Sequence, residues 1–220
     1  MKTTFADCAI LAAGASSRMG RPKLHLPLGR STVLGSTVDA ALAAGLRVIV
    51  VGRPDDARME SYAMEDRVVV LRNPDPERGM LSTLRVALGR LEAEAFFFMP
   101  GDMPFVKPGT FAILLGAIGE APVVPTCDGR RGHPVLLPSR LVPAILGLAE
   151  GGSLRDFLAS LSPRFVETGD RGILTDIDLP SDYEEARGVV GLGHSAGAGD
   201  IAGTGAGTPG SAGDITGAGA

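Results

Sequence analysis

The chain of 220 residues is 45% hydrophobic and 21% charged, with a formal net charge of −4. These values are ordinary for a globular protein, and without a long basic run they argue against nucleic acid as a partner, because nucleic-acid binding relies on neutralising phosphates. No apolar run reaches the roughly 18 residues that span a membrane, and no signal-peptide pattern precedes the first expected strand, so we expect a cytoplasmic protein with no membrane partner.

Apolar runs typical of buried strands alternate along the chain with segments of helical spacing. We expect strands over Cys8–Ala12, Arg47–Val51, Val68–Leu71, Phe96–Met99, Val123–Thr126, Pro134–Leu137 and Phe165–Glu167. We expect helices from a Ser31 or Thr32 cap to Ala44, from Asp56 to Met64, and over Gly79–Leu91, Lys107–Ile118, Leu141–Ala149 and Leu154–Leu161, with a last helix from a Ser181 cap to Val190. This alternation predicts an α/β fold with three layers and a mostly parallel, doubly wound sheet.

The composition changes after Val190. Residues 191–220 are dominated by Gly, Ala, Ser and Thr and contain few large apolar side chains. Such a segment buries too little apolar surface to offset the entropy lost on ordering. We therefore expect one domain over residues 1–190 and a disordered Gly/Ala-rich tail over residues 191–220.

The segment Leu11–Lys23 follows the first expected strand and turns abruptly to small residues. Small residues let the backbone approach a ligand closely, and exposed amides in a loop can cradle phosphate. Arg18 and Lys23 add two cations, so the segment fits a triphosphate site. It lacks the spacing of a Walker loop or of a dinucleotide fingerprint. The alternative is an ordinary loop between strand and helix that carries surface cations.

Two further segments follow expected strands and so lie at the same edge of the sheet, where ligands bind in such folds. Asn73 begins a proline-rich turn, and Gly79 opens a helix whose N-terminus favours anions. Asp102 follows a Pro-Gly turn after the fourth strand. A carboxylate there can hold Mg²⁺ against phosphates, and the alternative is a helix cap.

Later residues are less specific. Asp176 and Asp178 would share one side of an extended segment, so one of them could complete a metal site; the alternative is a pair of solvated turn carboxylates. Arg131 and His133 follow a glycine turn. One interpretation is that they contact a second substrate. The alternative is that His133 has a structural role, which is more common for a single histidine. We expect Cys8 and Cys127 to be free thiols.

Five blocks of the sequence together resemble the MobA-like nucleotidyltransferases, most closely the molybdenum cofactor cytidylyltransferases. The resemblance covers about residues 6 to 190, in matching order and spacing. The blocks are Leu11–Lys23, Asn73–Arg85, Gly101–Pro104, Arg131–Leu137 and Asp176–Asp182. It implies a nucleotide-diphospho-sugar transferase-like, Rossmann-like fold and a nucleotidyltransferase domain over residues 1–190.

The resemblance also implies a reaction in which CTP and molybdopterin–molybdenum give a cytosine dinucleotide cofactor and pyrophosphate. Mg²⁺ is the implied cofactor, and a molybdenum hydroxylase or its chaperone is the implied client. Members that use CTP carry Leu-Ala-Ala-Gly where GTP-using relatives carry Leu-Ala-Gly-Gly. Ala13 therefore favours cytosine.

Residue roles carried over from the family follow the matching motifs. Arg18, Lys23 and Asp102 are the implied catalytic residues, and Asp102 and Asp178 the implied metal ligands, with Asp176 as the alternative second ligand. Arg131 and His133 are the candidate acceptor contacts. The implied nucleotide-binding set is Leu11, Ala12, Ala13, Gly14, Arg18, Lys23, Asn73, Gly79, Ser82 and Asp102.

Two other functions fit the same sequence. A nucleotidyltransferase acting on a sugar phosphate or another phosphorylated metabolite would need the same core and a different acceptor region. A non-catalytic carrier of molybdenum cofactor would not need Arg18, Lys23 and Asp102 intact, so their presence speaks against it.

Overall fold

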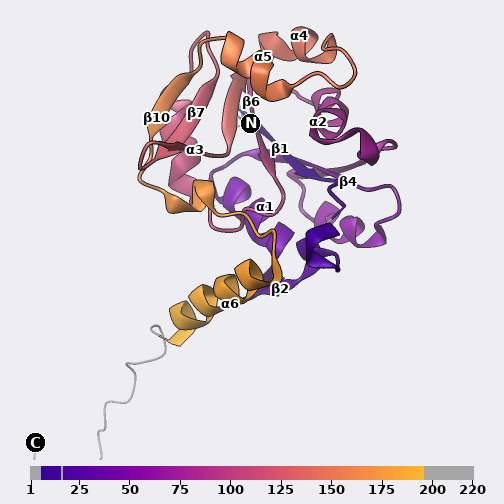
Figure 1. Ribbon diagram of the computed structural model, residues 1–220, viewed down its shortest axis with the longest axis vertical. Coiled ribbons are helices and arrows are strands. Elements are labelled where there is room, and N and C mark those ends of the chain that lie inside the picture. Colours follow the sequence, from indigo (N-terminus) through magenta and orange to yellow (C-terminus); the bar gives the residue numbers. More distant parts are fainter. Residues whose placement is uncertain (1–5, 16, 196–220) are drawn as a thin grey trace, which may run out of the picture.

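The computed structural model describes residues 6–15 and 17–195, and a twisted mixed sheet forms its centre (Figure 1). The strands of this sheet are β1 (Asp7–Ala12), β4 (Arg47–Gly52), β5 (Val68–Arg72), β6 (Ala95–Pro100), β7 (Val123–Cys127), β8 (Arg130–Arg131), β9 (Val135–Pro138) and β10 (Arg164–Glu167). Their order is β10-β7-β9-β6-β1-β4-β5, with β8 paired to β7. β9 runs antiparallel to β6 and β7, while β1, β4, β5, β6 and β10 form parallel pairs with their neighbours. The predicted mostly parallel sheet is confirmed.

Helices cover both faces of the sheet, which gives the three expected layers. The helices are α1 (Val33–Ala43), α2 (Met80–Leu88), α3 (Pro108–Leu115), α4 (Val142–Leu146), α5 (Leu154–Ser160) and α6 (Pro180–Ser195). Side chains of α1 and α3 share one core with alternate strand residues such as Ile10 and Phe97. Side chains of α2, α4 and α5 share the opposite core with the intervening residues, such as Ala9 and Phe96. Successive strand residues point to opposite faces, so one apolar run supplies both cores.

Strand β6 is central, as its unbroken apolar sequence predicts. It pairs with β1 on one side and β9 on the other, and Phe96, Phe97 and Phe98 are all buried. The Phe97 ring meets Phe111 of α3 edge-on, with ring centroids 5.1 Å apart. Cys8 and Cys127 are buried free thiols, as expected. Within the described part of the chain, no helix is both long and apolar enough to cross a membrane.

The first helix begins as predicted, with the Thr32 hydroxyl accepting the Gly35 amide at 2.9 Å. The last helix corrects our expectation. α6 begins at Pro180, so Ser181 is not its cap, and the helix continues past Val190 to Ser195. The Asp182 carboxylate does the capping, because it accepts the backbone amides of the two residues before the helix. The tail was expected over residues 191–220, but residues 191–195 belong to α6, and residues 196–220 lie outside the described residues.

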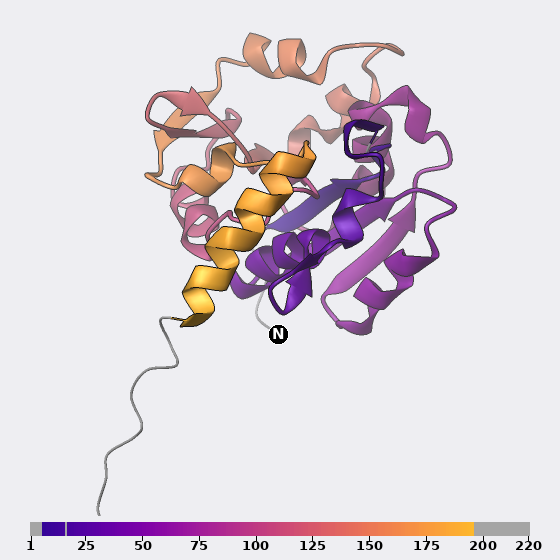
Figure 2. The same cartoon turned by 60° about the horizontal axis from the view of Figure 1, so that its bottom comes forward.

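A short hairpin, β2 (Pro27–Leu28) with β3 (Ser31–Thr32), replaces the linker expected between Lys23 and α1. It joins α6 in a third, smaller core with Met19 and Ile177. The Tyr183 hydroxyl of α6 donates to the Pro27 carbonyl at 2.7 Å. Figure 2 shows α6 lying against these early segments. The hairpin and α6 therefore hold the cationic loop against the segment that precedes α6.

Candidate functional site

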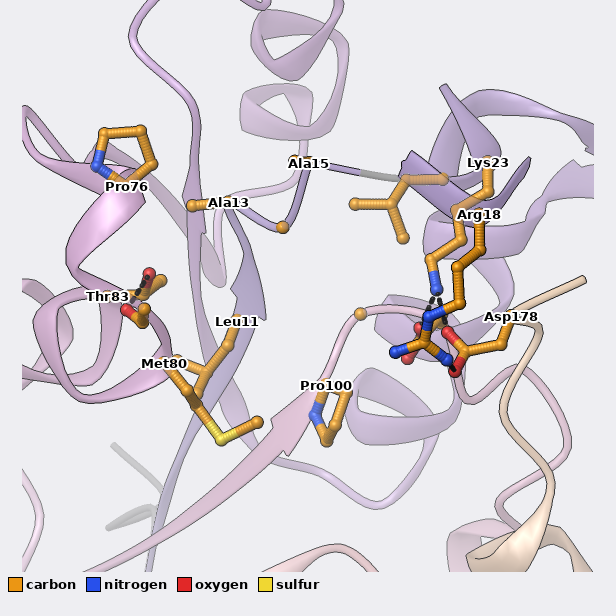
Figure 3. A pocket seen from close by; sticks show the side chains of 15 residues that line it. Leu11, Ala13, Ala15, Arg18, Lys23, Pro76, Met80, Thr83, Pro100 and Asp178 are labelled. Atoms are coloured by element: carbon orange, nitrogen blue, oxygen red, sulfur yellow. Dashed lines mark hydrogen bonds and ion pairs between the residues drawn. The ribbon is translucent and has the colours of Figure 1, made fainter. Parts of the chain in front are cut away.

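A pocket of about 340 Å³ opens at the carboxyl ends of β1 and β6. Figure 3 shows its two ends: Arg18 and Lys23 converge on Asp178 at one, and Pro76, Met80 and Thr83 lie at the other. Leu11, Ala13 and Pro100 lie between these ends. The complete lining is Leu11, Ala13, Gly14, Ala15, Arg18, Lys23, Leu24, Pro76, Gly79, Met80, Thr83, Pro100, Gly101, Asp102 and Asp178. The pocket lies at the strand ends that the sequence indicated, and ligand binding there stays a prediction.

Asp102 reaches the pocket through a tight turn at Gly101. The Gly101 amide donates to the Leu11 carbonyl at 3.0 Å, and its own carbonyl accepts the buried Thr37 hydroxyl at 3.1 Å. A Cβ at Gly101 would lie 3.0 Å from a methyl group of Leu34 and 3.4 Å from the Leu11 carbonyl oxygen. The close approach of β1 and β6 therefore favours a glycine here, and the turn places Asp102 at the pocket wall.

Asp178 belongs to the segment just before α6, which is far from Asp102 in the sequence. The Ile177 amide donates to the Asp102 carbonyl at 3.1 Å, and the Ile177 side chain is fully buried in the third core. The Asp182 carboxylate accepts the Asp178 amide at 3.0 Å. These contacts fix Asp178 on the pocket wall. Asp176 is exposed and lines a different hollow, so the expectation that both carboxylates share one side is wrong. The segment is not a regular strand, and Ile177 anchors it between them.

Lys23 lies between the two carboxylates of the pocket. Its ammonium nitrogen is 2.5 Å from Asp102 Oδ2 and 2.7 Å from Asp178 Oδ1. Arg18 also pairs with Asp178, from a more exposed position. The structure thus brings together four charged residues that the sequence analysis had marked as candidates. They are Arg18, Lys23, Asp102 and Asp178.

The environments of these groups shift their pKa values in different directions. Burial raises the pKa of the Asp102 carboxyl, and the hydrogen bond from Lys23 only partly opposes this. The hydrogen bond from Lys23 lowers the pKa of Asp178. Burial acts to lower the pKa of Lys23, but hydrogen bonds to both carboxylates outweigh it and the net shift is upward. Burial disfavours the charged form of a side chain, whereas a neighbouring opposite charge favours it. Because the two carboxylates outweigh burial, Lys23 stays an ammonium ion.

Asp102 has one oxygen suited to a further ligand. Its Oδ1 atom is buried and has no hydrogen-bond partner among the described residues. Within that part of the chain, no group of three or more His, Cys, Asp or Glu side chains could hold a metal ion. Two carboxylates that share a metal with phosphate oxygens are typical of Mg²⁺, which takes oxygen ligands and keeps few protein contacts. The residues present therefore fit a magnesium–nucleotide complex better than a metal caged by protein alone.

The opposite end of the pocket is formed by the start of α2. Gly79 precedes the helix with φ 84°, a conformation that favours glycine, and Gly79, Met80 and Thr83 line the pocket. Ser82 and Asn73 do not line it. Asn73 is 1% exposed, and its amide group donates to Thr83 and accepts from the Asp75 amide and the Ser82 hydroxyl. Its predicted nucleotide contact stays a prediction, while its hydrogen bonds position the start of α2.

Asn73→Ala tests this positional role. The substitution removes three hydrogen bonds and leaves polar groups unsatisfied in a buried place, which we expect to cost about 2–3 kcal/mol of the free energy of unfolding. Urea unfolding measures this loss. Ser82→Ala is the matched control, because at a partly exposed position it removes one of the three bonds of Asn73, together with the contact of its hydroxyl to the Asp75 carbonyl. An Asn73→Ala variant as stable as the Ser82→Ala variant would contradict the role.

The two candidate acceptor residues do not line the pocket. Arg131 is exposed on β8 and lies over the Phe165 ring, 4.4 Å from its centroid. His133 is largely enclosed, and its ring meets Phe98 edge-on with centroids 5.8 Å apart. Burial lowers the pKa of His133 to about 4. The structural role of this histidine is favoured, and acceptor contact by either residue stays a prediction.

The pKa of His133 predicts a loss of stability in mild acid. Between its ordinary pKa of 6.5 and its value of about 4 in the fold, only the unfolded chain binds the proton. Stability therefore falls as pH drops through this window, by about 2 kcal/mol between pH 7 and pH 5. Denaturant unfolding at both pH values measures it. His133→Gln should remove this part of the pH dependence; an unchanged difference would show that another group causes it.

Several residues that line or support the pocket were not predicted as site residues from the sequence, among them Pro76, Met80 and Arg53. Pro76 and Met80 lie within a segment that was singled out, but no signal marked them individually. Arg53, at the end of β4, donates to the Ala13 carbonyl at 3.4 Å and forms an ion pair with Glu77 at 2.8 Å. It thereby connects the loop after β1 to the turn before α2. Its position directly after a strand was the signal that could have found it.

Comparisons with known proteins show the family of this chain. Residues 8–165 match the family described as the MobA-like NTP transferase domain. The chain is 30% identical to the molybdenum cofactor cytidylyltransferase of Escherichia coli K12, over 82% of this chain and 95% of that protein. It is 28% identical to the molybdenum cofactor guanylyltransferase of Pasteurella multocida, over 70% of this chain and 82% of that protein.

A solved structure is also similar. The fold superposes with a TM-score of 0.68 and 28% identity on Rv0371C of Mycobacterium tuberculosis in complex with manganese, covering 85% of this chain and 100% of that one. The expected nucleotide-diphospho-sugar transferase fold is therefore confirmed.

Proposed function

This chain belongs to the family of MobA-like NTP transferase domains, and from that premise we propose that it transfers CMP from CTP to molybdopterin–molybdenum, with release of pyrophosphate. The observation that carries the proposal is the pocket itself. One end gathers Arg18 and Lys23 with two carboxylates, and the other is a less charged niche beside Met80 and Thr83. A nucleoside triphosphate has the same division into an anionic tail and a planar base.

Each end of the pocket has a role in binding. We assign the base to the niche between the loop that holds Ala13 and the first turn of α2, lined by Ala13, Met80 and Thr83. The triphosphate extends to Arg18 and Lys23. Arginine suits a bidentate phosphate contact and lysine a point charge.

The proposed reaction does not require the protein to remove a proton from the nucleophile. The terminal phosphate of the acceptor is already an anion, and it attacks the α-phosphorus of CTP while pyrophosphate leaves. Arg18 and Lys23 orient the triphosphate and stabilise the negative charge that builds on the leaving group. No general base is required, which agrees with a pocket that contains no histidine among its lining residues.

Asp102 and Asp178 would hold Mg²⁺. When bound, this ion supplies further neutralisation of charge on the phosphates. The unpartnered Oδ1 of Asp102 supports its role as the main ligand. The manganese in the similar mycobacterial structure supports a divalent ion.

Ala13 supports cytidine as the base. Its carbonyl is held by Arg53, and its side chain lines the pocket. We expect Ala13→Gly to lower the preference for CTP over GTP about tenfold, because the loss of a methyl group changes the space and the backbone freedom beside the base. Competition between the two nucleotides in a pyrophosphate-release assay measures the preference. An unchanged ratio would mean that Ala13 does not select the base.

The acceptor is tested by a panel of phosphates with CTP as the donor. Pyrophosphate release that needs molybdopterin–molybdenum supports the proposal. Release only with a sugar phosphate or another phosphorylated metabolite would move the activity to that acceptor, and no release with any acceptor would favour a carrier. Because guanylyltransferases are among the relatives, each arm is repeated with GTP. A molybdenum hydroxylase as the client stays a prediction.

A further inference from the structure

Lys23 occupies the position between Asp102 and Asp178 that a divalent ion would share. We propose that Lys23 is an exchange cation: it neutralises both carboxylates until a nucleotide arrives, and the triphosphate then draws its ammonium away and frees the carboxylates for the metal ion. The inference rests on the proposed function and adds an order of assembly to it. The nucleotide displaces the lysine before the metal ion takes its place, and the metal ion alone binds weakly.

The contacts of Lys23 support this exchange. Its ammonium is within 2.7 Å of one oxygen of each carboxylate, and the side chains of Lys23 and Asp102 are only 12% and 13% exposed. Lys23 is the ion-pair partner that the described residues provide for Asp102, whereas Asp178 has Arg18 as well. An ion that binds Asp102 must therefore compete with this ammonium for oxygen atoms in a confined space.

The exchange needs only a movement of the lysine side chain. The backbone around Lys23 is fixed by the buried Leu24 side chain and by the Leu26 amide, which donates to the Lys23 carbonyl at 3.1 Å. The neighbouring His25 is held by Asp56 at 2.5 Å. A lysine has four rotatable side-chain bonds, so its ammonium can reach a phosphate in the same pocket while the loop stays in place.

The thermodynamic consequence is a reciprocal coupling. If the nucleotide removes a cation that competes with the metal ion, it raises the affinity for the metal, and the metal raises the affinity for the nucleotide by the same factor. Removing the lysine should lower that coupling. It should also make the free carboxylates better metal ligands, although it removes a contact to the nucleotide.

The test is a titration of the full chain with Mn²⁺, followed by electron paramagnetic resonance, with and without CTP. No acceptor is added, so CTP is not consumed. We expect Lys23→Met to bind Mn²⁺ about tenfold more tightly than the wild type without CTP, and the gain caused by CTP to shrink by about the same factor. Arg18→Met is the matched control. It removes a cation that touches Asp178 alone, and its effect should stay below about threefold.

Equal or weaker Mn²⁺ binding by Lys23→Met would overturn the proposal, as would equal tightening in Arg18→Met. Adding Asp102→Asn to Lys23→Met should abolish the gain, which places the ion at this site. If Lys23→Met does not fold, ¹⁵N-lysine NMR of the wild type decides. The Lys23 ammonium signal should shift with CTP alone and stay in place with dilute Mg²⁺ alone; the reverse pattern would overturn the proposal.

The two proposals fail in different ways. The Mn²⁺ titrations without nucleotide do not depend on which base or acceptor the protein uses. An enzyme that used another acceptor would still show the tighter binding in Lys23→Met, while the acceptor panel would show that CMP is not transferred to the pterin.

Discussion

Asp102→Ala is expected to lower the turnover number about 1,000-fold or more while leaving the fold intact. The substitution removes the carboxylate with the unpartnered buried oxygen, and so the proposed main ligand for the divalent ion that would neutralise the phosphates. Losing one preorganised electrostatic contact of this kind costs about 100- to 1,000-fold in turnover, and losing the metal ion with it adds to the effect. The backbone turn survives, because the Gly101 and Ile177 amides hold it. Pyrophosphate release at saturating Mg²⁺ and CTP measures the loss.

Two controls separate this loss from general damage. Thermal unfolding of the Asp102→Ala variant should stay near that of the wild type, since the burial that raises the pKa of this carboxyl also makes its charge costly. Asp176→Ala removes an exposed carboxylate from the same segment as Asp178 but from outside the pocket, and it should leave turnover nearly unchanged. Near-normal Mg²⁺-dependent turnover by Asp102→Ala would contradict its role as the metal ligand.

Lys23→Met is expected to lower kcat/KM about 100-fold or more, although the same variant should bind Mn²⁺ more tightly without nucleotide. In the proposed mechanism the ammonium moves to the triphosphate and stabilises the leaving pyrophosphate, a contact that strengthens in the transition state. Steady-state rates at several CTP concentrations measure the effect and separate kcat from KM. A change confined to KM would indicate ordinary binding that is equal in ground and transition states.

Two matched variants sharpen the comparison. Lys23→Arg keeps a positive charge and should recover part of the rate, but its planar group cannot take the compact position between two carboxylates. Arg18→Met should cost less, because its side chain is 69% exposed and solvent screens its charge. If Arg18→Met were the more damaging change, Arg18 would be the principal contact of the leaving group, and the role proposed for Lys23 would be wrong.

The fold could be predicted where the chain repeats simple physical patterns. The run that became β6 is apolar throughout, and those that became β1 and β4 are apolar after their first residues, Asp7 and Arg47, because both faces of a central strand are buried. Thr32 marked the start of α1 because a hydroxyl there satisfies a free amide of the first turn. The position of Asp102 at the pocket wall could be predicted because it follows such a strand after a Pro-Gly turn.

Long-range contacts explain much of what could not be predicted. The choice between Asp176 and Asp178 depends on Ile177, whose amide bonds to Asp102 far away in sequence. The start of α6 was missed for a local reason: the Asp182 carboxylate accepts the amides of Asp178 and Leu179, just before the helix, and the capping pattern at Ser181 did not indicate this. The hairpin of β2 and β3 is two residues long on each side, too short for a periodic signal, and it is stabilised by packing against α6.

Residue type alone also gave too little information about Asn73 and His133. Both occur in motifs that resemble functional blocks, yet Asn73 uses its hydrogen bonds inside the protein and His133 packs against Phe98. Polar residues inside a motif can support a site without touching the ligand. Burial decides between these roles, and burial depends on the whole fold.

The central claim is that CMP moves from CTP to the pterin phosphate, and labelled CTP tests it most directly. CTP carrying ³²P at the α-phosphate is incubated with the protein, Mg²⁺ and molybdopterin–molybdenum, and the products are separated. We predict that the label joins the pterin product and that one pyrophosphate is released for each labelled product. Label that stays in CTP, or that appears only on another added phosphate acceptor, would contradict the claim.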